Sequence, residues 1–202
     1  MAQPGLVYLD LGADHALLAM ALAEQGFKVY ASENKWGPFT ILKDSLLKNN
    51  SSVICYLADG LTDLPKDVGG VFILGMGGKT MTEILSRHPS RLAALKQLVI
   101  EPQSDAYLPI HYLLTHGFKN DKGRYVFEKH AYPLLSFVPT ADPVSYSREE
   151  ETFGPCPLAQ KDPLLGKLLQ QQLERLNALA ILSPKAQNEK TLLAKAWTLW
   201  NS

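Results

Sequence analysis

The amino-acid sequence predicts an α/β protein with a Rossmann-like, doubly wound and mostly parallel sheet, an antiparallel last strand and a C-terminal helical hairpin. Three observations lead to this prediction. Short, nearly continuous apolar runs alternate with helical patterns over the first two-thirds of the chain, which is typical of parallel strands buried on both faces. The last two apolar runs have no helix between them, and two amphipathic stretches end the chain.

The predicted parallel strands are short apolar runs, each followed by polar residues or glycine. They are residues 6–9, 28–31, 53–57, 71–74 and 98–100. Helical patterns separate them, at residues 16–23, from Pro38 onward, at 79–86 and at 108–116. Pro38 suits the first turn of its helix, and Phe39, Leu42 and Leu46 share one face of it. Because crossovers between parallel strands are right-handed, these elements form a doubly wound sheet.

The last third of the chain has a different pattern. Residues 125–127 and 134–138 read as a hairpin that completes the sheet. Residues 141–158, with three prolines and three consecutive glutamates, read as a linker or a packed loop. Asp162 and Pro163 provide a helix start, we expect Pro184 to end this helix, and a second helix is expected over 189–200. The predicted domains are a Rossmann-like domain over 1–145 and a linker with a helical, coiled-coil-like region over 146–202.

Composition limits the possible functions. The 202 residues are 46% hydrophobic and 20% charged, and 20 Lys and Arg balance 20 Asp and Glu. This zero net charge excludes a bulk polybasic nucleic-acid-binding protein but not a local basic patch. We find no signal-peptide pattern and no apolar run near the roughly 20 residues of a membrane span. Cys55 and Cys156 have neither metal-site nor disulfide spacing. We expect a cytoplasmic monomer or weak dimer without a metal ion.

The residues after the first strand favour a cationic ligand. Asp10, Leu11, Gly12, Ala13, Asp14 and His15 follow one another there, at the edge where ligands of such sheets bind. Gly12 allows a tight turn, but Asp14 stands where a dinucleotide-binding motif has glycine. Its carboxylate would repel a diphosphate, which disfavours NAD and FAD. It would attract an ammonium or a sulfonium group, and S-adenosyl-L-methionine (SAM) carries both.

The next three strand ends are consistent with such a ligand. Glu33, beside Asn34, can accept hydrogen bonds from both ribose hydroxyls. Asp59 can accept one from an adenine amino group, and Gly60 lets the backbone approach closely. Gly75, Met76, Gly77 and Gly78 form an open segment, which we call the glycine shelf, and Met76 can cover a ring.

Taken together, these segments resemble the bacterial tRNA (adenine-22-N1)-methyltransferase family of class I SAM-dependent methyltransferases. The matching segments are 9–16, 31–34 with 37–39, 58–61, 75–78 and 153–155 with the Leu-rich helix after it. The resemblance implies a SAM-dependent enzyme that methylates N1 of adenine 22 in tRNA. Two segments depart from the family pattern: Leu17-Leu18-Ala19 replaces Tyr-Leu-Pro, and Glu101-Pro102-Gln103 replaces Gln-Pro-Asn.

The resemblance also implies site roles. The methionine side of SAM would be lined by Asp10, Gly12, Asp14 and His15. Glu33 and Asn34 would hold the ribose, Asp59 and Gly60 the adenine, and the glycine shelf would be the floor of the transfer site. Asp14 is the first candidate to stabilise the positive charge that develops on the target ring, with His15 as its proton partner.

A tRNA substrate would need basic side chains at its phosphates. Residues 79–130 and 160–202 each carry a net charge of +3, whereas 1–78 and 131–159 each carry −3. The candidates are Lys79, Arg87, Arg91, Lys119, Lys122, Arg124, Lys161, Lys167 and Arg175. Two alternatives remain open at this point. One is a SAM-dependent methyltransferase of a small molecule, and the other is a non-catalytic protein that binds SAM or RNA.

Overall fold

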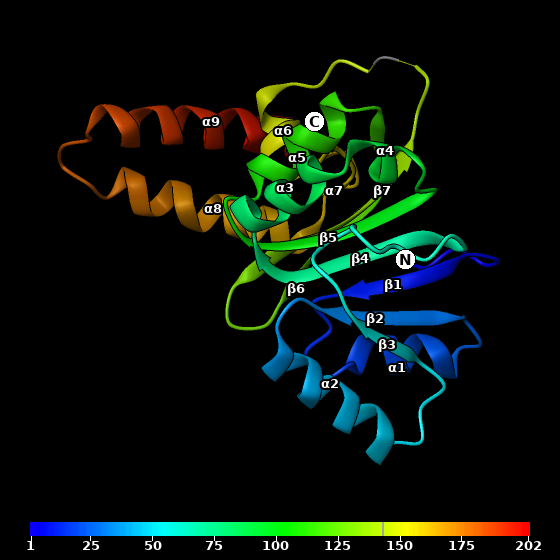
Figure 1. Cartoon of the computed structure of the whole chain (residues 1–202). Helices are drawn as coiled ribbons and strands as arrows, with labels where there is room; N and C mark the ends of the chain where they lie inside the picture. Colours follow the sequence, from blue (N-terminus) through cyan, green and yellow to red (C-terminus); the bar gives the residue numbers. More distant parts are fainter. Residues whose placement is uncertain (143) are drawn as a thin grey trace.

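The computed structural model, which describes residues 1–142 and 144–202, places its strands in one mixed sheet (Figure 1). The strands are β1 (Val7–Leu11), β2 (Val29–Glu33), β3 (Ile54–Leu57), β4 (Val68–Gly77), β5 (Gln97–Ser104), β6 (Phe118–Phe127) and β7 (Ala131–Pro139). Their order is β3-β2-β1-β4-β5-β7-β6. The first five strands pair in parallel, and β7 pairs antiparallel to both β5 and β6. The predicted fold class is therefore confirmed.

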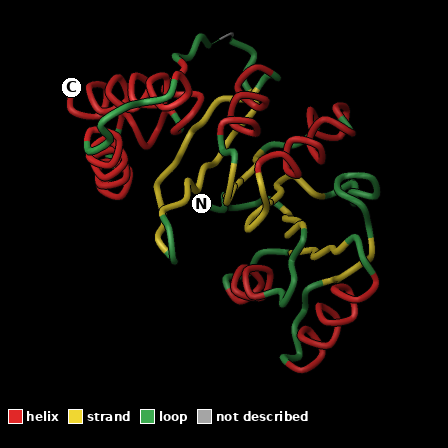
Figure 2. The backbone as a smooth tube through the Cα atoms, turned by 90° about the vertical axis from the view of Figure 1, so that its left-hand side faces the viewer, coloured by secondary structure: helices red, strands yellow, loops and turns green. Residues whose placement is uncertain are grey.

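Helices cover both faces of this sheet, as Figure 2 shows from a second direction. One face carries α1 (Leu17–Glu24) and α2 (Trp36–Lys48), and the other carries α3 (Gly78–Arg87), α4 (Pro89–Ala93) and α5 (Tyr107–Thr115). The chain ends with α6 (Arg148–Phe153), α7 (Pro155–Ala159), α8 (Pro163–Asn177) and α9 (Pro184–Asn201). None of the helices in the described part of the chain has the length and apolar character needed to cross a membrane.

Neighbouring residues of the central strands form two separate cores. Leu9 and Ile73 are fully buried in the cluster that α3 and α5 cover, whereas Tyr8 and Phe72 are buried in the cluster that α1 and α2 cover. This division follows from strand geometry, since successive side chains of a strand point to opposite faces. A sheet buried on both faces explains why the strands read as continuous apolar runs.

The segment 141–158 folds into short packed helices rather than an extended linker, although residue 143 lies outside the described part. Ser147 caps α6: its hydroxyl accepts from the backbone N–H of Glu150, and the Glu150 carboxylate accepts from the backbone N–H of Ser147 at 2.7 Å. This reciprocal arrangement is a capping box. Helix α7 then packs against β6.

The expected role of Pro184 was wrong. Helix α8 already ends at Asn177, and Pro184 is the first residue of α9. The hydroxyl of Ser183 accepts a hydrogen bond from the backbone N–H of Ala186 at 3.3 Å. A serine cap followed by a first-turn proline is a helix start, so the second helix begins before residue 189.

Helices α8 and α9 form an arm that contacts the hairpin of β6 and β7 through α8. The indole N–H of Trp200 donates to the carbonyl oxygen of Asp162 at 3.0 Å, and its ring packs over Gly166. The arm projects on the side of the sheet where the parallel strands have their carboxyl ends (Figure 1). The arm therefore faces the edge at which a ligand is expected.

Replacing Gly78 by alanine tests how tightly this edge is built. A Cβ at Gly78 would overlap the backbone carbonyl oxygen of Asp105 and lie 2.7 Å from that of Ser104. Because backbone atoms cannot move aside cheaply, we expect Gly78→Ala to lower the free energy of unfolding by about 2–3 kcal/mol. Gly37→Ala in α2 is the control, since no atom lies within 4 Å of its Cβ position. Equal urea-unfolding midpoints for the two variants would contradict this packing.

Candidate cofactor and substrate site

The carboxyl ends of β1 to β4 meet at a pocket of about 280 Å³, which we call the cofactor pocket because residues predicted to bind the cofactor line it. Each of these strands contributes a residue that the sequence singled out. They are Gly12 after β1, Glu33 and Asn34 at the end of β2, Asp59 and Gly60 after β3, and Met76 in β4. The structure thus brings together six predicted cofactor residues from four separate segments.

Gly12 makes the turn after β1 possible. Its φ of +74° lies in the left-handed region, which glycine adopts without strain. The backbone N–H groups of Gly12 and Ala13 donate to the carbonyl oxygen of Ser32 at 2.9 Å and 3.2 Å. A Cβ at Gly12 would overlap the terminal methyl group of Met76. The loops after β1 and β4 therefore touch at this position.

Glu33 connects the first two strand ends. Its carboxylate accepts a hydrogen bond from the backbone N–H of Asp14 at 2.8 Å. The Asp14 side chain is 71% exposed, and its carboxylate lies 3.8 Å from Nε2 of His15. Asp14 and His15 are thus held beside the pocket by the loop, with their side chains directed toward solvent and not among the residues that line the cavity.

Asp10 lies underneath this loop, with only 5% of its surface exposed. Burial raises the pKa of Asp10 to about 7; the backbone N–H of Ala19 opposes this shift, and the nearby Glu33 carboxylate adds to it. The cause is desolvation, which disfavours the charged form of a carboxyl group. Asp10 is buried beneath the loop and is not among the residues that line the pocket.

Asp59 forms an ion pair that the sequence did not reveal. Its carboxylate lies 2.6 Å from a guanidinium nitrogen of Arg87, at the C-terminal end of α3. Arg87 had been predicted to contact phosphate, yet it lines the cofactor pocket together with three other residues of α3. These are Thr80, Glu83 and Ile84. Their spacing of three and four residues places them on one helix face, which is the signal that could have identified them.

The glycine shelf is held from behind by β5. The backbone N–H of Gly75 donates to a carboxylate oxygen of Glu101 at 2.8 Å, and burial raises the pKa of Glu101. Gly77 pairs with Ser104 in the ladder between β4 and β5. Within the shelf, Met76 lines the cofactor pocket, whereas Gly75, Gly77 and Gly78 lie beside it.

A second and larger pocket of about 880 Å³ lies between the end of β5, the hairpin of β6 and β7, and helices α6 and α8. Sequence reasoning missed it because its walls come from segments far apart in the chain. Of the nine basic candidates, Lys167 lines this pocket, and Arg175 pairs with Glu189 at 2.9 Å. Five others are exposed on the surface: Lys79, Arg91, Lys119, Lys122 and Arg124. Lys161 donates to the carbonyl oxygen of Asn201 at 3.2 Å.

Comparison with known proteins identifies one family and several similar structures. A family model described as tRNA (adenine(22)-N(1))-methyltransferase matches residues 8–199. A Streptococcus pneumoniae protein in complex with S-adenosyl-L-methionine has a similar structure, with a TM-score of 0.80, 25% identity, and coverage of 98% of this chain and 91% of that chain. No curated protein sequence matches this chain.

Two further structures share the fold. TrmK of M. capricolum in complex with S-adenosyl-homocysteine has a TM-score of 0.82 at 20% identity, with coverage of 96% of this chain and 92% of that chain. The m1A22 tRNA methyltransferase of B. subtilis has a TM-score of 0.76 at 22% identity, with coverage of 98% and 91%.

The pKa of Asp10 predicts a specific dependence of stability on pH. Its ordinary pKa in an unfolded chain is about 3.9, and its pKa in the folded protein is about 7. Between these values the folded state binds more protons, so stability from Asp10 falls as pH rises. We expect the free energy of unfolding of the wild type, relative to Asp10→Asn, to fall by up to about 1.4 kcal/mol per pH unit from pH 4 to 7. The free energies of unfolding are measured by urea titration at each pH. The same dependence on pH in the wild type and in Asp10→Asn would contradict this prediction.

Proposed function

The chain belongs to the tRNA (adenine(22)-N(1))-methyltransferase family, and from this membership and the geometry of the pocket we propose which residues carry out the reaction. The protein is a SAM-dependent methyltransferase that acts on N1 of adenine 22 in tRNA. The observation that carries the assignment of residues is the meeting of Gly12, Glu33, Asp59 and Met76 at one pocket.

The residues of this pocket fit SAM. Glu33 and Asp59 supply carboxylates that can accept hydrogen bonds from the ribose hydroxyls and the adenine amino group. A carboxylate has about four acceptor positions, so Glu33 can keep the Asp14 N–H and accept a hydroxyl as well. Asp10 is a buried carboxyl group next to the turn at Gly12.

The chain contributes mainly alignment to the reaction. When bound, SAM supplies a methyl group on a sulfonium, and the lone pair of adenine N1 needs no strong base to attack it. The protein must therefore hold the two groups in line, and this proximity can account for much of the rate. The Asp14 carboxylate, fixed through its own backbone by Glu33, stabilises the positive charge that develops on the adenine ring. His15, whose Nε2 lies 3.8 Å from that carboxylate, is close enough to act as its proton partner when the substrate is bound.

The substrate approaches over the glycine shelf. N1 lies on the Watson–Crick edge, so the target adenine must leave its stack and pairing to react. Gly75 is exposed, and no heavy atom lies closer than 4.0 Å to its Cβ position, which lets a flat base approach the backbone there. Exposed basic residues such as Lys79 and Arg124 contact the phosphates. Because tRNA is the substrate, we place the protein in the cytoplasm.

Transfer of labelled methyl from SAM to unmodified tRNA tests this function. We expect 1-methyladenosine as the product by nucleoside analysis, because N1 is the reacting atom. A tRNA with guanine in place of adenine 22 is the matched control and should accept no methyl group. Labelling of the guanine-containing tRNA, or turnover without any RNA, would contradict the assignment.

Asp14→Asn tests the charge proposed for catalysis. Asp14 has a φ of 46°, and asparagine tolerates this left-handed conformation whereas alanine would strain it. We therefore expect the loop to persist and kcat to fall about 100-fold, since charge stabilisation at the transition state is lost. Asp44→Asn on the exposed face of α2 makes the same chemical change away from the pocket. A kcat for Asp14→Asn equal to that of Asp44→Asn would rule out the role.

A further inference from the structure

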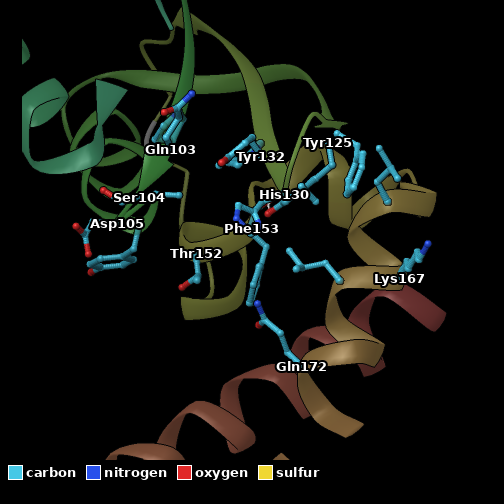
Figure 3. Close-up of a pocket in the computed structure, with 18 of the residues that line it drawn as sticks. Gln103, Ser104, Asp105, Tyr125, His130, Tyr132, Thr152, Phe153, Lys167 and Gln172 are labelled. Carbon is cyan, nitrogen blue, oxygen red and sulfur yellow. Dashed lines mark hydrogen bonds between the residues drawn. The ribbon is translucent and has the colours of Figure 1, made fainter. Parts of the chain in front are cut away.

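The pocket between the β6–β7 hairpin and α8 lies outside the cofactor site and contains a group of aromatic, amide and basic side chains (Figure 3). We propose that this pocket, which we call the hairpin pocket, binds a nucleotide adjacent to adenine 22 in the tRNA strand. In this binding mode the base of that nucleotide stacks on Phe127 and Tyr132. The inference rests on the tRNA methylation assigned above and names a second contact with the same substrate.

The position of the hairpin pocket supports a neighbouring nucleotide rather than the target itself. The pocket shares no lining residue with the cofactor pocket, so a base inside it is away from the reacting methyl group. Gln103 and Ser104 line the hairpin pocket, and Ser104 pairs with Gly77 of the glycine shelf in the ladder between β4 and β5. Adjacent strands are about 4.8 Å apart. A strand of RNA with one base over the shelf therefore reaches this pocket with its next nucleotide.

Two of the aromatic rings that line the pocket are open to a ligand. Phe127, at the end of β6, is 68% exposed, and Tyr132 of β7 is partly exposed. In Figure 3 the ring of Tyr132 lies between Gln103 and Tyr125 along the upper side of the group of lining residues. Single-stranded RNA is commonly bound by stacking of bases on such rings.

Two other large rings of the pocket, those of Tyr107 and Tyr125, are held by close contacts, whereas the ring of Tyr132 makes a T-shaped contact with His130 at 6.3 Å between ring centres. The guanidinium of Arg148 lies 3.4 Å from the ring centre of Tyr107, and His111 stacks on Tyr107 at 5.0 Å. Tyr125 is buried, and its hydroxyl donates to the carbonyl oxygen of Phe153 at 3.3 Å. These contacts make Tyr107 and Tyr125 part of the wall, and leave Phe127 and Tyr132 as the stacking surface.

The polar groups of the pocket also match a nucleotide. Lys129 and Lys167 contribute two positive charges against the single carboxylate of Asp105, which favours a phosphate. The amide groups of Gln103 and Gln172 can both donate and accept, as the edges of bases require. The volume of about 880 Å³ is at the upper end of the usual range for small-molecule sites, so a whole nucleotide fits.

Fluorescence of 2-aminopurine tests this contact directly. The probe replaces the nucleotide on either side of adenine 22 in the full tRNA, and the complete protein is added with S-adenosyl-homocysteine. We expect the emission to change on binding at one of the two positions, because stacking on an aromatic ring alters it. Phe127→Ala and Tyr132→Ala should remove most of that change, whereas Tyr132→Phe, which keeps the ring, should preserve it.

Kinetics provide the second readout. We expect Phe127→Ala and Tyr132→Ala to raise the KM for tRNA about 5-fold to 100-fold, the range that loss of one stacked base implies. The affinity for SAM, measured by calorimetry, should stay unchanged because the cofactor pocket is separate. Leu47→Ala on α2 is the matched control, since Leu47 is 66% exposed and far from the pocket in sequence and fold.

The results separate this inference from the methylation assignment. A wild-type protein that forms 1-methyladenosine but leaves the emission unchanged at both positions would refute the hairpin pocket alone. An unchanged KM for tRNA in Phe127→Ala, whose exposed side chain is not needed for folding, would also refute it. Failure of the wild type to methylate tRNA would instead refute the function on which the inference rests.

Discussion

The parallel pairing of β1 with β2 on one side and with β4 on the other is the constraint on which the site depends. This pairing makes the carboxyl ends of β1 to β4 open at one edge. The loops after β1 and β4 then touch where the methyl group of Met76 lies against Gly12. A side chain at Gly12 would displace this flexible methyl group, and the φ of +74° at this position also favours glycine. The cofactor pocket is thus a consequence of strand order, and its polar residues are those that each strand can place at its end.

The elements that could be predicted from the sequence are those whose signal is local. The five parallel strands were found because each is a short apolar run, which burial on both faces imposes on the central strands. Glu33 and Asp59 were found because each lies at or just after the end of a strand. Helices α4, α6 and α7, with five or six residues each, are too short to show a 3.6-residue period. The role of Pro184 was misjudged because a proline can end one helix or begin the next, and Ser183 decides between them. The Asp59–Arg87 pair and the hairpin pocket depend on tertiary contacts, which no local pattern encodes.

The zero net charge of the chain is the sum of segments with opposite net charges. Residues 1–78, which carry −3, supply most of the cofactor pocket, and the ligand proposed for it carries a sulfonium and an ammonium group. The two segments that carry +3, 79–130 and 160–202, supply both lysines of the hairpin pocket and the remaining basic candidates. In the proposed assignment, a cationic cofactor and an anionic substrate thus meet segments of opposite net charge. This separation lets each attract its ligand without a large total charge on the chain.

The end of β5 contacts the glycine shelf and also lines the hairpin pocket. Glu101 accepts the N–H of Gly75 and so fixes the start of the glycine shelf, while the backbone at Ser104 and Asp105 leaves no room for a side chain at Gly78. The same short segment then supplies Gln103, Ser104 and Asp105 to the hairpin pocket. A carboxylate at position 101 is suited to this task because an ionised carboxylate accepts hydrogen bonds and donates none. The N–H of Gly75 opposes the rise in the pKa of Glu101 that burial causes. Since one segment positions both the shelf and the hairpin pocket, the place of the target base and that of its neighbour are set together.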